Sequence, residues 1–94
     1  MVQKNQYSKA QKAYLVSLRH KLGNLYRLEK DSKVVVDRRW VNGFMAAGYH
    51  SGLISLSDLR LECLSAYRAV FSNRMSDAQE VQLERRLMKL CEQE

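Results

Sequence analysis

The sequence predicts an all-α fold: a compact single domain, residues 1–94, built as a bundle of about four helices. Proline is absent and glycine occurs only four times, a composition that suits long helices joined by short turns. Leucine and aromatic residues recur at intervals of three and four, the spacing of one helix face. The chain is 46% hydrophobic, which at this length supports one modest core and not two.

The first helix is predicted over residues 8–30. At 100° per residue, its apolar residues gather in one stripe and its basic residues gather on the opposite side. The stripe consists of Tyr7, Tyr14, Leu18, Leu22 and Leu25, flanked by Leu15, Tyr26 and Leu28. The bases are Lys9, Lys12, Arg19, His20, Arg27 and Lys30. We therefore expect the stripe to face the core and the bases to face outward.

A second helix is predicted over residues 37–48, after a turn at residues 30–33. The β-branched residues 34–36 are interpreted as its entry, because a lone strand would lack a partner in this chain. Asp37 or Ser32 is the expected cap. The apolar positions form two neighbouring lines, Trp40, Phe44 and Gly48 on one and Val41 and Met45 on the other.

Two further helices are predicted over residues 56–73 and 77–92. The stretch from Gly48 to Gly52 holds two glycines and indicates a helix end followed by a turn. Capping patterns mark both later starts: Ser55 with Asp58 resembles a capping box, and Ser76 with Gln79 is an S-x-x-Q box. The expected inward residues are Leu56, Leu59, Cys63, Tyr67 and Val70 of the third helix and Leu83, Leu87 and Leu90 of the fourth.

Positive charge is concentrated in the first part of the chain. Residues 1–40 carry ten Lys/Arg and three acids, whereas residues 41–94 carry six Lys/Arg and seven acids. Glu29 is the only carboxylate among residues 1–30, so the first helix lacks the Glu–Lys pairs that usually intersperse a solvated face. Such a field attracts polyanions or acidic protein surfaces.

These observations predict that the basic side of the first helix binds a nucleic acid or an acidic protein. The candidate binding residues are Lys9, Lys12, Arg19, His20, Arg27, Lys30, Arg38 and Arg39. Trp40, Tyr49 and His50 are candidate interface anchors, because Trp and Arg are enriched in interface hot spots and the glycine turn would expose Tyr49 and His50. The only tryptophan of a small helical protein usually lies in its core, however, and we expect that of Trp40.

Metal sites and catalysis fit the sequence poorly. The His and Cys residues are His20, His50, Cys63 and Cys91, and no two lie closer than thirteen positions. Structural zinc ligands come in pairs two to five residues apart. There is no glycine-rich phosphate loop, and cysteines at apolar spacing behave as small hydrophobes. We expect no metal, no cofactor and no enzymatic activity.

A helix-turn-helix over residues 44–61 is also disfavoured. Aligning the turn glycine with Gly48 puts Gly43 where an apolar residue should pack, and aligning it with Gly52 puts Asp58 there. The reading helix would present Asp58 and Glu62 beside a single base, a poor surface for phosphates.

The remaining expectations concern location and function. No apolar run is long enough to span a bilayer and no secretory signal is visible, so we expect a cytoplasmic protein, without a membrane partner, whose cysteines are reduced core thiols. In size and makeup, though in no residue signature, the chain resembles the small accessory proteins of phages and plasmids that modulate host machinery. Three functions stay open. The first is a regulatory module whose basic helix docks on nucleic acid or a nucleoprotein complex, and its rival is an inhibitor or adaptor that docks the same helix on an acidic protein. A homo-oligomer, or a small-ligand binder formed at an oligomer interface, is the third.

Overall fold

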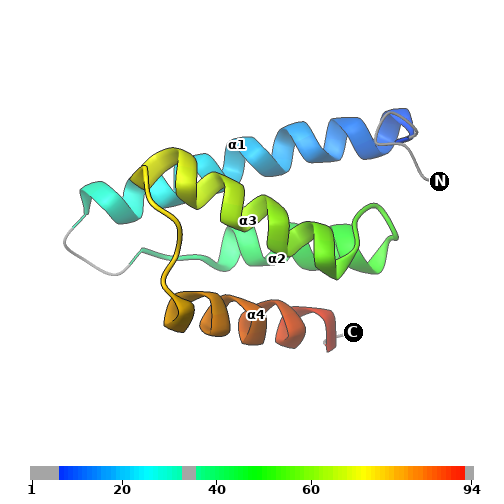
Figure 1. Cartoon of the computed structure of the whole chain (residues 1–94). Helices are drawn as coiled ribbons and strands as arrows, with labels where there is room; N and C mark the ends of the chain where they lie inside the picture. The colour runs from blue at the N-terminus through cyan, green and yellow to red at the C-terminus, as the bar shows by residue number, and fades with distance from the viewer. Residues whose placement is uncertain (1–6, 33–35, 93–94) are drawn as a thin grey trace.

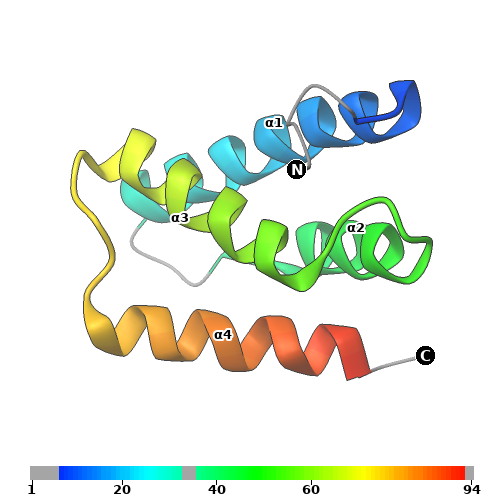
Figure 2. The same cartoon turned by 45° about the vertical axis from the view of Figure 1, so that its right-hand side comes forward.

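The structure is a computed structural model that describes residues 7–32 and 36–92, and it confirms the all-α bundle. The four helices are α1 (Lys9–Asp31), α2 (Arg39–His50), α3 (Leu56–Phe71) and α4 (Asp77–Glu92). Figures 1 and 2 show α1 and α4 on opposite sides of the molecule, with α2 and α3 between them. Accordingly, α1 and α4 each pack chiefly on α2 and α3. None of the described helices combines the length and apolarity needed to cross a bilayer.

The core confirms the predicted stripe of α1. Leu18 and Leu22 are 0% and 1% exposed, and they share one buried cluster with side chains from the other three helices. Leu28 is the exception, because it is 51% exposed. It projects about 80° from the centre of the stripe, on the side away from α3, where it shares a shallow pocket with Trp40 in the first turn of α2.

The α1–α3 contact is the most extensive helix pair in the bundle. Tyr26 of α1 packs edge-on against Tyr67 and Phe71 of α3, with ring centroids 5.6 and 6.5 Å away. Contacts between Arg19 and Glu62, and between Lys30 and Val70, show that the two helices run in the same direction.

Local capping explains why the helix starts were predictable. Ser76 Oγ accepts from the Gln79 amide at 3.2 Å and Gln79 Oε1 accepts from the Ser76 amide at 2.9 Å, so the predicted box is present. Ser55 Oγ accepts from the Asp58 amide at 3.1 Å. A further capping box, formed by Ser8 and Gln11, opens α1; its S-x-x-Q pattern is visible in the sequence.

The start of α2 differs from the prediction. The helix begins at Arg39 rather than residue 37, and its N-cap, Arg38, makes no side-chain capping bond. Asp37 lies just outside and accepts from the Arg39 amide at 2.9 Å, whereas Ser32 caps the end of α1. Val36 precedes the helix and belongs to no strand, which agrees with its interpretation as the entry to this helix; residues 34 and 35 lie outside the described part.

Gly48 lets α1 and α2 approach closely. A Cβ at this position would lie 2.1 Å from Tyr14 Cζ. The Tyr14 ring stacks on Phe44 with a centroid separation of 4.6 Å, and its hydroxyl donates to the Phe44 carbonyl at 2.9 Å. α2 therefore turns Val41 and Met45 into the core. Trp40, expected in the core, is 43% exposed, because the first turn of α2 lies at the edge of this contact.

Candidate functional site

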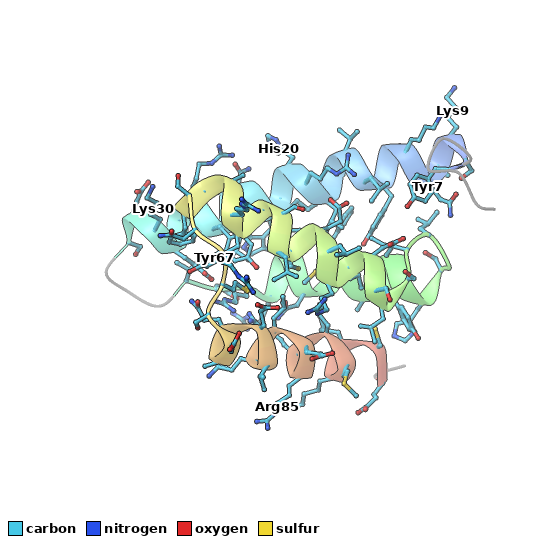
Figure 3. The ribbon with its side chains drawn as sticks, viewed as in Figure 1. Tyr7, Lys9, His20, Lys30, Tyr67 and Arg85 are labelled. Carbon is cyan, nitrogen blue, oxygen red and sulfur yellow. The ribbon has the colours of Figure 1, made fainter. Side chains whose placement is uncertain are left out.

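Four of the candidate bases, Lys9, Lys12, His20 and Arg27, lie on the side of α1 that points away from the bundle. Figure 3 shows this for Lys9 and His20. All four are exposed, and among residues 7–32 and 36–92 none of them makes an ion pair. Val16, which is 67% exposed, lies among them. We call this surface the outer face of α1; it consists of Lys9, Lys12, Val16, His20 and Arg27.

Arg19 does not belong to that free surface. Its Nε and Nη2 atoms donate to the two carboxylate oxygens of Glu62 on α3, at 2.7 and 3.1 Å. This hydrogen bonding raises the pKa of Arg19. The prediction that the basic side lacks balancing acids is therefore wrong at Arg19, because its carboxylate comes from a residue 43 positions later in the chain.

Arg38 and Arg39 are also paired with acids. Arg38 and Glu29 form an ion pair, with Arg38 Nε 2.6 Å from Glu29 Oε2. This carboxylate oxygen is buried and accepts no hydrogen bond within the described chain. Arg39 Nη2 lies 2.8 Å from Asp37 Oδ2, and its hydrogen bonds lower the pKa of Asp37 to about 2. Neither arginine extends the outer face of α1.

A groove of about 760 Å³ runs between α1 and α3. The Arg19–Glu62 pair lies at one end, and Lys30 lies at the other, where its Nζ donates to the Val70 carbonyl at 3.1 Å. Small residues line the space between them. We call this space the α1–α3 groove; its lining residues are Arg19, Gly23, Arg27, Lys30, Asp31, Glu62, Ser65, Ala66, Ala69 and Val70.

The three candidate anchors do not form one site: the rings of Tyr49 and His50 contact each other edge-on, with centroids 5.3 Å apart, but Trp40 lies at the other end of α2. Trp40 shares its shallow pocket with Leu28 and Arg27. Tyr49 is half-buried against the core and His50 is exposed, with its Nε2 3.4 Å from the Leu90 carbonyl. Both belong to the last turn of α2 and not to the turn that was expected. Trp40 and His50 therefore stand about 15 Å apart along one helix, at 1.5 Å per residue.

The thiols are placed as core residues rather than as reactive groups. Cys63 is buried and Cys91 is half-buried, and both are free. Burial raises the pKa of Cys63 to about 12 and also raises the pKa of Cys91. Since the thiolate is the nucleophile, neither cysteine is activated. In the part of the chain that the structure describes, no three His, Cys, Asp or Glu side chains gather closely enough to hold a metal ion.

Comparison with known proteins adds no relative: the chain matches no family model, no curated protein and no solved structure at a significant level. Sequence reasoning had missed the α1–α3 groove. Its only signal is the small residues Gly23, Ser65 and Ala69, and their spacing does not say which helix faces them.

Proposed function

We propose that the protein is a small non-enzymatic binding module, of the inhibitor or adaptor type, that docks the outer face of α1 on an acidic protein surface. The observation that carries this proposal is the mixture of exposed bases and exposed apolar side chains. Val16 lies between Lys12 and His20 on the helix, and exposed Leu28 follows Arg27. Apolar contacts surrounded by charge, with Arg and Trp enriched, are typical of protein interfaces.

The charge of α1 supports an acidic partner. The helix contains six Lys/Arg and only two carboxylates, Glu29 and Asp31. Glu29 is already held by Arg38. A surface of this kind speeds encounter with an oppositely charged protein and disfavours basic ones.

Docking on nucleic acid or a nucleoprotein complex is the second candidate. Its support is the row of Lys9, Lys12 and Arg27, which extends about 27 Å along the helix at 1.5 Å per residue. Phosphates would nevertheless have to compete with Glu62 for Arg19. Tyr14 and Tyr26 are buried, so they offer no stacking platform to single strands.

Site-specific photo-crosslinking in the cells that make the protein tests the first proposal. A photoreactive amino acid at Val16 should crosslink an acidic protein, and Lys12→Glu with Arg27→Glu should abolish that product. The matched control is the same amino acid at Val81, an exposed valine on α4. Equal crosslinking from both positions would reject a specific role for α1.

Salt titration of binding to random-sequence duplex DNA separates the two candidates. If phosphates are the ligand, Lys9→Gln, Lys12→Gln and Arg27→Gln together should flatten the slope of log K against log salt by about 2.7, or about 0.9 for each contact. Such a result would replace the protein partner with nucleic acid. Weak binding with an unchanged slope would leave the acidic protein as the partner.

A further inference from the structure

The α1–α3 groove has the shape of a helix-binding groove. Gly23 of α1 and Ser65 and Ala69 of α3 carry little or no side chain, and the Arg27 guanidinium lies over Gly23, with its Nη2 3.3 Å from where a Cβ would stand. Small residues allow another helix to approach to the 8–10 Å axial separation of packed helices. From Arg19 to Lys30 the groove extends about 16 Å, the length of three helical turns.

The charges along the groove favour an acidic occupant. Arg27 donates to the side-chain amide of Asn24 and Lys30 donates to a backbone carbonyl, and neither has a carboxylate partner among the described residues. The acids of the lining are Glu62, which is already bound to Arg19, and Asp31. Two unpaired cations therefore stand beside an apolar floor, which an acidic amphipathic helix complements.

A nucleic acid strand fits this groove poorly. None of its lining residues is aromatic, whereas single strands are usually held by stacking on aromatic side chains. The floor is instead formed by the small apolar groups of Ala66, Ala69 and Val70.

The area that a protein partner must bury also favours the α1–α3 groove as part of the interface. One face of α1, about 34 Å long and about 10 Å wide, presents only about 340 Å², while specific interfaces bury about 800 Å² per partner. A partner on the outer face of α1 must therefore reach a neighbouring surface. Arg27 belongs to both the outer face and the groove, so the two surfaces are continuous.

We infer that the α1–α3 groove receives a three-turn, acidic amphipathic helix of the partner protein, with its apolar side on Ala66 and Ala69 and its carboxylates on Arg27 and Lys30. This inference rests on the proposed function, because it needs a protein partner. It adds which part of the partner binds and where.

Crosslinking from within the groove tests the inference. A small aliphatic diazirine amino acid at Ser65, which lines the groove, is compared with the same amino acid at Ser57, an exposed serine on the same helix outside the lining. The product from Ser65 should contain one partner segment with apolar residues at i, i+3 or i+4 and i+7, flanked by Asp or Glu. Ser57 should give no such product.

Filling the groove gives the second arm of the test. Ala69→Leu should lower the Ser65 crosslink about tenfold, whereas Ala47→Leu, at another exposed helical alanine, should not. Lys30→Glu should also abolish the product, and exchanging the facing acid of the identified segment for lysine should restore it.

The outcomes separate the inference from the proposed function. Crosslinks from Val16 without any from Ser65 above the Ser57 level would overturn the groove and leave the acidic partner in place. A Ser65 product with nucleic acid, or with a segment lacking the acidic amphipathic pattern, would also overturn the groove. Silence at both Val16 and Ser65 would end both proposals.

Discussion

The two faces of α1 belong to one helix but differ in their surroundings: the inner face is packed against the other helices, and the outer face is exposed. On the inner face, Leu18 and Leu22 are enclosed by the bundle, and the Tyr14 hydroxyl donates to a carbonyl of α2. On the outer face, Lys9 and Lys12 are exposed and make no ion pair among the described residues. Arg19 is also a basic residue predicted on that side of the helix, yet the fold pairs it with Glu62. An apolar stripe thus predicts packing directly. A basic stripe indicates a binding site only where its residues are not already paired with carboxylates of the same protein.

The largest test of this contrast is truncation on each face. Leu18→Ala and Leu22→Ala should each lower the free energy of unfolding by about 2–5 kcal/mol, because both side chains are fully enclosed. Val16→Ala, two residues before Leu18 and on the outer face, should change it by less than about 0.5 kcal/mol. Urea unfolding followed by circular dichroism measures all three. Equal effects at positions 16 and 18 would show that the two faces are not distinct.

The close contact at Gly48 sharpens the description of the inner face. Gly48→Ala should destabilise by about 1–3 kcal/mol, because its Cβ would overlap the Tyr14 ring. Gly43 lies in the same helix with nothing within 4 Å of a Cβ, so Gly43→Ala should stabilise by about 0.4–1 kcal/mol. The two melting temperatures should move in opposite directions; a gain at Gly48 would contradict the packing.

Alkaline pH should lower the free energy of unfolding, through the ionisation of buried groups in the core. Burial raises the pKa of Tyr14 from 10.0 to about 12 and that of Cys63 from 9.0 to about 12. Since these pKa values are higher in the folded state, their stabilising effect is complete below pH 9 and is lost as pH rises from 9 to 12. Urea midpoints measured across this range should fall. Tyr14→Phe should make the fall shallower between pH 10 and 12, and an unchanged curve would refute this role.

The smallest expected effect separates two arginines of α1. Arg19→Gln should cost about 0.2–1 kcal/mol, the range of exposed ion pairs, because its side chain is 60% exposed despite its two bonds to Glu62. Arg27→Gln should leave stability unchanged. A double-mutant cycle with Glu62→Gln measures the coupling, which should be present for Arg19 and absent for Arg27.

Local signals account for most of what the sequence predicted correctly. The start of α4 was predictable because the Ser76–Gln79 box lies within four residues, and the stripe of α1 was predictable because helical period alone places it. The position of Trp40 was not, since it depends on where the Tyr14–Gly48 contact sets α2. The Arg19–Glu62 pair joins helices whose adjacency no local pattern specifies, and for this reason the outer face of α1 was predicted too broadly.

The partnership of α1 with α3 also sets when the chain can fold during its synthesis. After α2 has been made, the side of α1 that carries Tyr26 still lacks Tyr67 and Phe71, the rings that cover it. Domains generally fold as units, and a nascent chain exposes apolar surface until its contacts are complete. We therefore expect α1 to stay incompletely covered until the last turn of α3 has left the ribosome, so that a pause in translation between Ser51 and Phe71 would expose Tyr26 to chaperones and proteases.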